Sequence, residues 1–191
     1  RGTDISLSLQ VTPPFSLWDG KDYASMKKID NYYESAEKFR WIEYHKWKFK
    51  AKTFTALAGM DTKRTHVLMT RAEYGFVGFF NKNKKSPFET FYVGGDGMSG
   101  YSSTYATETI GLRGYENGSL GTQASAYSRL ALELRYPLIL EPSSTIYLLG
   151  FVEAGNAWND LKDFNPFDLK RSAGFGARIM LPMIGLMGID W

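Results

Sequence analysis

Hydrophobic and polar residues alternate along several parts of this chain, a pattern typical of β-strands that have two different faces. Near the start, Ile5, Leu7 and Leu9 take alternate positions, with Ser6 and Ser8 between them. The alternation recurs in residues 46–52, 127–138 and 174–181. A helix would bring apolar residues back at every third or fourth position, and these segments do not. The pattern therefore predicts an all-β protein.

The connections between the predicted strands fall into two length classes. The alternation predicts about seven strands, near residues 2–12, 39–57, 66–79, 127–139, 145–158, 170–182 and from 186 onward. Residues 58–65, 140–144 and 183–185 form short turns, whereas residues 13–38, 80–126 and 159–169 form long loops. Long and short connections alternate strictly along the chain. An antiparallel up-and-down transmembrane β-barrel with all its long loops on one side has this order.

A soluble antiparallel sheet with one wet face also alternates, so it is the main alternative to a membrane barrel. Two observations favour the barrel. Loops as long as residues 80–126 are uncommon in compact soluble domains. Aromatic residues gather near the predicted strand ends, as they do at membrane interfaces; these are Trp18, Trp41, Tyr136 and Trp158.

Four lysines, Lys46, Lys48, Lys50 and Lys52, alternate with Trp47, Phe49 and Ala51 and must share one face of a strand. A lysine that faces lipid at the membrane midplane costs roughly 2–4 kcal/mol. The lysines therefore face water, which is either the lumen of a barrel or the solvent around a soluble sheet.

Composition narrows the possible functions. The net charge of +3 is too small for a typical nucleic-acid-binding protein. The chain has no cysteine, which excludes disulfides and thiolate sites, and no apolar run long enough for a transmembrane helix. His45 and His66 lack metal-ligand spacing, and no Gly-x-Ser-x-Gly motif is present. We therefore predict no enzyme activity, catalytic residue, metal or cofactor.

The alternation runs to both ends of the chain, so we expect a piece of a longer protein. Bacterial single-chain barrels usually have an even number of strands and must close, because an open edge in lipid leaves backbone groups unpaired. About seven strands do not meet this requirement. Closure would need further strands, another copy of the chain, or a setting outside the membrane.

The long loop contains the segment GLRGY, residues 111–115, preceded by PFETFYVGGDGMSGY (87–101). These segments resemble the Arg-Gly-aromatic motif of the BamA/TamA outer-membrane assembly superfamily and the lead-in to that motif, and two further segments follow in the same order. GFVEAGNAW (150–158) is similar to the family's Phe-x-Asp-x-Gly strand, with Glu153 in place of aspartate. Residues 171–191 resemble the penultimate pair of strands, although the Pro-Met-Ile-Gly turn at 182–185 departs from the usual pattern.

The resemblance implies that residues 1–191 form the carboxy-terminal half of a barrel of roughly 16 strands. Loop 80–126 folds inward in this arrangement. The resemblance also implies that the POTRA domains, the first barrel strands and the last strand lie outside residues 1–191. The implied function is non-enzymatic assembly and insertion of β-barrel proteins in the bacterial outer membrane. The implied partners are unfolded outer-membrane proteins, outer-membrane lipid and accessory assembly lipoproteins, and no nucleic acid. Alone, the piece is expected to be inactive.

The resemblance also implies a site in which the long loop meets the inner wall. The loop motif comprises Gly111, Leu112, Arg113, Gly114 and Tyr115. The inner-wall partner comprises Phe151, Glu153 and Gly155, which share one strand face because side chains alternate with period two. Arg113 is expected to point inward and contact Glu153, since a guanidinium can bind a carboxylate through two hydrogen bonds. The alternative is that Arg113 is a solvated loop residue.

Three other functions remain open. A TamA-like or two-partner secretion translocation pore shares the Arg-Gly-aromatic motif. A passive porin-like channel and a soluble lipid-binding sheet share only the alternating strands.

Overall fold

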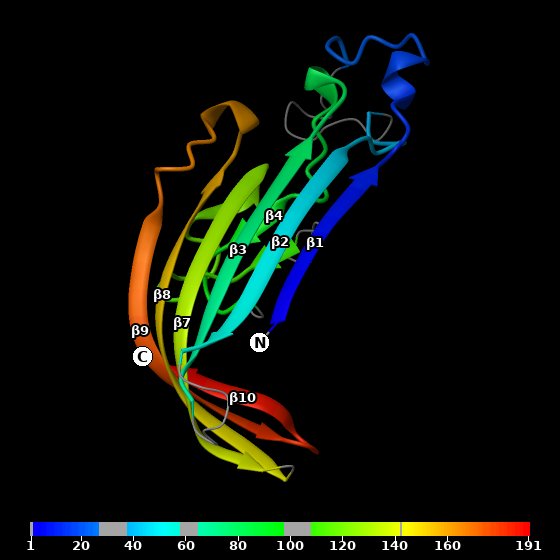
Figure 1. Cartoon of the computed structure of the whole chain (residues 1–191). Helices are drawn as coiled ribbons and strands as arrows, with labels where there is room; N and C mark the ends of the chain where they lie inside the picture. The colour runs from blue at the N-terminus through cyan, green and yellow to red at the C-terminus, as the bar shows by residue number, and fades with distance from the viewer. Residues whose placement is uncertain (1, 27–37, 58–64, 98–107, 142) are drawn as a thin grey trace.

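A curved antiparallel sheet of seven strands dominates the structure, a computed structural model that describes residues 2–26, 38–57, 65–97, 108–141 and 143–191 (Figure 1). The strands follow the same order in the sheet as in the chain: β1 (Gly2–Val11), β2 (His45–Ala56), β3 (Val67–Gly78), β7 (Ala126–Glu141), β8 (Ser144–Trp158), β9 (Lys170–Leu181) and β10 (Gly185–Asp190). The predicted all-β fold is therefore confirmed, and the sheet matches part of a barrel wall.

The two faces of this sheet differ sharply in polarity. The convex face is apolar and open: Leu7, Leu132 and Phe175 are 69, 52 and 63% exposed. The concave face carries charge, because the strand register places Lys50 beside Glu73 and Glu73 beside Arg129. The lysines of residues 46–52 face this concave side, as the alternation predicts.

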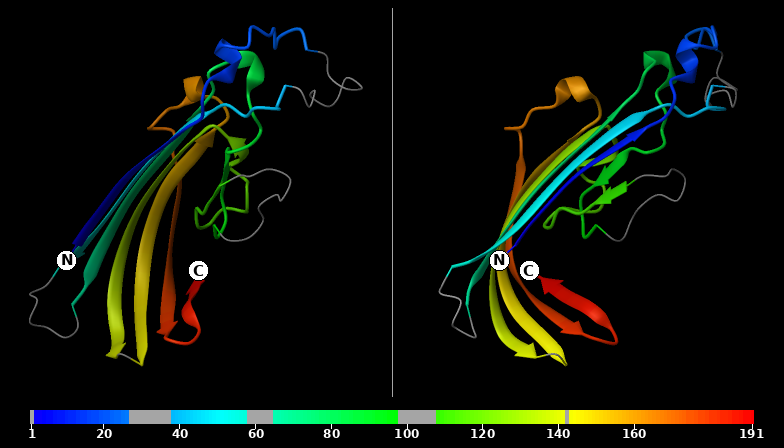
Figure 2. Two further views of the ribbon diagram at one scale, coloured as in Figure 1. Left: turned by 90° about the vertical axis from the view of Figure 1, so that its right-hand side faces the viewer. Right: turned by 45° about the vertical axis from the view of Figure 1, so that its right-hand side comes forward.

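The described parts of residues 91–125 lie against the concave side of the sheet (Figure 2). They form a small sheet of three short strands in the order β5 (Glu108–Ile110), β4 (Phe91–Val93) and β6 (Gly121–Ala124). Buried apolar side chains join the small sheet to β3 and β7; they are Val77, Phe91, Val93, Ile110, Ala124 and Tyr127. The predicted loop is thus packed against the wall, and a hydrophobic core holds it there.

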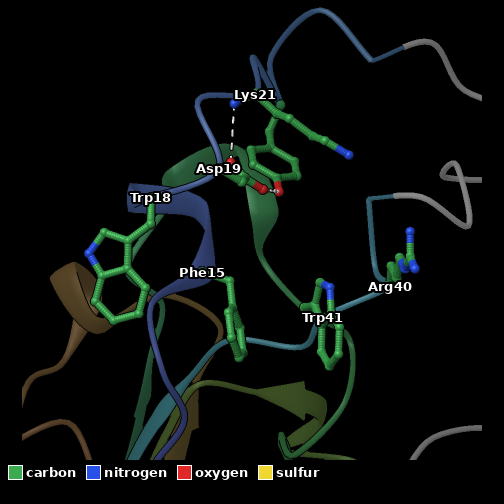
Figure 3. Close-up of a pocket in the computed structure, with 7 residues that line it drawn as sticks. Phe15, Trp18, Asp19, Lys21, Arg40 and Trp41 are labelled. Carbon is green, nitrogen blue, oxygen red and sulfur yellow. Dashed lines mark hydrogen bonds between the residues drawn. The ribbon is translucent and has the colours of Figure 1, made fainter.

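Some predicted boundaries are wrong. The strand expected from residue 39 begins at His45, because the preceding side chains pack into a surface segment. Trp41 contacts Phe15, with ring centroids 5.1 Å apart (Figure 3). Buried Glu43 accepts hydrogen bonds from Ser16 N (2.7 Å) and from Lys84 Nζ (2.6 Å). These contacts take the place of strand pairing in residues 39–43, whereas the carbonyl oxygen of Tyr44 still accepts a hydrogen bond from Thr12 N (3.0 Å).

The connections also differ from expectation in detail. Strand β7 continues to Glu141, so the predicted turn at 140–144 is shorter than expected. The glycine-rich segment 108–121 is a loop only in its middle, since β5 and β6 occupy its ends. Strands of three or four residues are too short to show alternating apolar and polar positions in the sequence. Most of the predicted turn at 58–65 and the end of the 87–101 lead-in lie outside the described residues.

The described parts of the connections contain three short 3-10 helices: η1 (Phe15–Leu17), η2 (Lys82–Lys84) and η3 (Leu161–Asp163). Among the residues described, no helix is both long and apolar enough to cross a membrane.

Candidate functional site: the contact between loop and wall

Residues 111–115 run along the inner wall formed by β7, β8 and β9. Leu112 is buried and forms an isolated bridge with Gly95, which fixes the start of the segment within the loop. Gly114 has a φ of +83°, a conformation that side chains other than glycine rarely adopt. Tyr115 Oη donates a hydrogen bond to the carbonyl oxygen of Arg171 on β9 (2.8 Å). The backbone therefore turns sharply beside Arg113 and directs its side chain at the wall.

Arg113 and Glu153 are in direct contact. The backbone N–H of Arg113 donates to Glu153 Oε2 (2.9 Å). The guanidinium donates to Glu153 Oε1 through Nε (3.0 Å) and Nη2 (2.7 Å). Glu153 is fully buried and the Arg113 side chain is 14% exposed. Both carboxylate oxygens of Glu153 thus accept hydrogen bonds from the loop, and the charge of Arg113 compensates a buried anion.

Further charged residues of the wall extend this contact into a network. Arg113 Nη2 also donates to Glu133 Oε1 on β7 (2.6 Å). Arg129, also on β7, donates to Glu153 Oε1 (3.0 Å), and Arg135 donates to Glu133 Oε2 through Nε (2.9 Å). The two carboxylates therefore share three guanidinium groups, and a single loop residue connects two strands of the wall.

Phe151 and Gly155 shape the surface on either side of Glu153. The Arg113 guanidinium carbon lies 3.7 Å from the centroid of the Phe151 ring, a cation–π contact. Gly155 leaves room for the loop: a Cβ atom there would lie 2.6 Å from the Ser128 carbonyl oxygen and 3.2 Å from Leu112 Cδ1. The structure therefore brings together the loop motif and the three wall residues selected from the sequence.

The network favours the charged form of the loop arginine. Burial by itself lowers the pKa of the Arg113 guanidinium, but its hydrogen bonds to Glu153 and Glu133 outweigh burial and raise that pKa above its ordinary value. The guanidinium is charged in any case, so the raised pKa reflects how well the two carboxylates stabilise it. Its arrangement suits it to holding the loop, since its donors point at carboxylates of the wall.

The sequence analysis missed Glu133 and Arg129 as members of the site. Both lie at alternate positions of the segment YSRLALELRYPL, opposite its leucines. This alternation was a usable signal, because it places them on the same wall as Glu153. Asp190 on β10 also lies near Arg113, with 3.8 Å between Oδ2 and Nη1.

A cavity of about 680 Å³ adjoins the Arg113 network. Basic side chains dominate its lining; they are Lys52, Arg71, Arg113, Arg129, Arg135 and Arg178. Glu133, Asp96 and Asp190 are the acidic residues of the lining. Within the described ranges, no group of three or more His, Asp or Glu residues could hold a metal ion.

The chain is similar to a known family and to a curated protein. The sequence model of the Omp85 superfamily domain matches residues 29–191. The outer membrane protein assembly factor BamA of Neisseria meningitidis serogroup B is 28% identical over 130 residues, which cover 61% of this chain. The matched region spans only 14% of the length of that protein.

Proposed function

The chain belongs to the Omp85 superfamily, and we propose that it is part of the barrel of a factor that assembles and inserts β-barrel proteins into the bacterial outer membrane. Its partners would be unfolded outer-membrane proteins, outer-membrane lipid and accessory assembly lipoproteins. The work would be physical rather than covalent: an exposed strand edge of the complete barrel pairs with strands of the incoming protein.

The observation that carries this proposal is the attachment of the long loop to Glu153 through Arg113. A loop held inside the barrel occupies the lumen, so it suits a passive channel poorly. It also braces β7 and β8 against each other through Glu133 and Glu153. A braced wall would give the exposed strand edge a fixed support while a substrate strand pairs with it.

The membrane setting has its own support. The convex face is apolar on neighbouring strands, and the charged network of Arg113, Glu133 and Glu153 lies on the concave side. Strands β1 and β10 each pair on one side only in the described sheet. We propose that further strands close the sheet into a barrel of roughly 16 strands, because unpaired backbone groups cost several kcal/mol each in lipid.

Depletion of the full-length protein in its own cells, followed by quantification of folded outer-membrane proteins, tests this function. A broad loss of many barrels supports general assembly. Loss of one secreted protein alone would make the protein a dedicated exporter, as a TamA-like or two-partner secretion pore would be. Unchanged barrels with altered solute uptake would make it a channel.

Re-expression of variants in the depleted cells then tests the loop contact. Arg113→Ala should restore barrel assembly only in part, because it removes charge-assisted hydrogen bonds that contribute on the order of 1.5–3 kcal/mol. Arg113→Lys is the matched control: it keeps the charge but loses the planar fork, so it should restore an intermediate level. Full restoration by Arg113→Ala would contradict the proposed role of the contact.

A further inference from the structure

A second charged contact joins the same loop to a different part of the wall. Glu108 at the start of β5 faces the lysines of β2. Lys48 Nζ donates to both carboxylate oxygens of Glu108, at 3.1 and 3.0 Å. Lys46 Nζ lies 3.2 Å from Glu108 Oε2 and 3.3 Å from Glu89 Oε2. Lys50 Nζ lies farther away, at 3.9 Å.

Burial makes this contact more than a surface ion pair. The Lys46 side chain is 3% exposed and Lys48 is 19% exposed. Lys46 Nζ also lies 4.9 Å from the centroid of the Phe91 ring on β4. A buried ammonium is costly without a partner, and within the described structure both carboxylates paired with Lys46 come from the loop. The charge of Lys46 is therefore compensated by docking of the loop.

The backbone conformation of Glu89 also supports this contact. Its φ of +66° is the only positive value recorded for a non-glycine residue in the described part of the chain. Such strain persists where surrounding contacts determine the conformation. The ion pair with Lys46 is one of these contacts, so the structure accepts local strain to place a second loop carboxylate beside the same lysine.

The two contacts have opposite polarity and lie apart. At the first, a loop cation meets wall carboxylates on β7 and β8. At the second, loop carboxylates meet wall lysines on β2, and β3 lies between β2 and β7 in the sheet. A loop docked in the reverse orientation would bring like charges together, which is unfavourable. Together, the two contacts fix the orientation of the loop as well as its attachment.

We propose that Glu108 and Glu89, with Lys46 and Lys48, form a second anchor that positions the loop independently of Arg113 and Glu153. These four residues act by holding the loop in its position on the wall. The significance of this anchor for barrel assembly rests on the proposed function, whereas its existence does not.

Pulsed electron paramagnetic resonance on the full-length protein in lipid vesicles tests the anchor. Spin labels at Thr109→Cys on β5 and Ala51→Cys on β2, in a background without other cysteines, report the distance from loop to wall. The parent protein should give one narrow distance. Glu108→Lys should broaden it, with about a tenfold fall in the ratio of docked to undocked loop, equivalent to about 1.4 kcal/mol.

Charge exchange provides the decisive control. Combining Glu108→Lys with Lys48→Glu should restore part of the narrow-distance population, because Lys48→Glu gives position 108 a partner of opposite charge while Lys46 still faces it. A generally misfolded protein would show no such recovery. Lys162→Glu on exposed η3 makes the same charge change as Lys48→Glu away from the loop and should have no effect. An unchanged distance in Glu108→Lys, or failure of the exchange to restore it, overturns the anchor.

Assembly of a substrate barrel, measured in the same vesicles, separates the two proposals. Parallel loss and recovery of distance and assembly support both the anchor and its role. A broadened distance that the exchange restores, with assembly unchanged throughout, keeps the anchor and overturns the proposed use of the loop in assembly.

Discussion

At the scale of single residues, buried charges of the wall and charges of the loop depend on one another. Glu153 is fully buried and accepts hydrogen bonds from both Arg113 and Arg129. Lys46 is nearly as buried and pairs with Glu89 and Glu108. Removing one partner of a buried ion pair commonly costs about 3–5 kcal/mol, because the other charge is left buried without a partner. The cost is smaller where water reaches the pair, and it is about 1 kcal/mol or less at a surface. A substitution in the loop is therefore also a perturbation of the wall.

The second anchor should respond to acid. Burial by itself raises the pKa of the Glu108 carboxyl, but the hydrogen bond from Lys48 and the charges of Lys46 and Lys48 outweigh burial, so its pKa lies below the ordinary value of 4.5. A lowered pKa means that the ionised carboxylate stabilises docking. This stabilisation is complete above about pH 4.5 and is lost as the pH falls through the lowered pKa.

Measurement of the same loop-to-wall distance as a function of pH checks this expectation. The parent protein should keep its narrow distance near neutral pH and lose part of the docked population below about pH 4.5. Glu108→Gln has a similar shape without a titrating group, so it should weaken docking near neutral pH and reduce the acid dependence. An identical pH profile for both proteins would show that another group controls docking.

Sequence reasoning reached one of the two anchors. The pairing of Arg113 with Glu153 follows from the family motif, which marks a loop arginine and a strand carboxylate. The alternation at residues 46–52 correctly placed the lysines on the polar face. It could not identify Glu108 as their partner, because that contact depends on how residues 79–125 fold. No local periodicity encodes the path of such a loop.

At the scale of elements, the alternation of apolar and polar residues along the sequence predicts the long strands. The short strands and the connections depend on tertiary packing. Each of β2, β3, β7, β8 and β9 has at least 12 residues, long enough to show alternation clearly. Strands β4 and β5 have three residues each, and tertiary contacts around Phe91 stabilise them. Residues 39–43 show the converse, since apolar residues there pack into a surface segment instead of a ladder.

The close approach of the loop to β8 makes a sharp prediction at Gly155. Gly155→Ala places a methyl group against the Ser128 carbonyl oxygen and Leu112, so it should destabilise the protein by about 1–3 kcal/mol and push the loop away from the wall. Gly150→Ala is the matched control on the same strand, because a Cβ atom there meets nothing within 4 Å. Urea unfolding in lipid vesicles measures both, and equal effects would contradict tight packing at Gly155.

At the scale of the whole molecule, the sheet separates an apolar convex face from a charged concave one. If the convex face contacts lipid, Leu132→Arg should destabilise the folded protein in vesicles by roughly 2–4 kcal/mol at the midplane. Leu161→Arg on η3 makes the same substitution at a leucine beyond the end of β8 and should cost far less. Equal costs in equilibrium unfolding would argue against a lipid-facing convex surface.

The connection between β3 and β7 has a consequence for the order of folding. These neighbouring strands are separated by the longest connection in the sheet, residues 79–125. The entropy lost on closing a connection grows with its length, and distant pairings slow folding. The hairpin of β7 and β8 is joined by a far shorter turn, so it can form early.

Pairing of β3 with β7 is therefore expected to occur late in folding. The hydrophobic contacts of Phe91 with Tyr127, followed by the two charged anchors, would offset its entropic cost. The loop that packs on the concave side of the sheet is thus also expected to join two preformed parts of the sheet during folding.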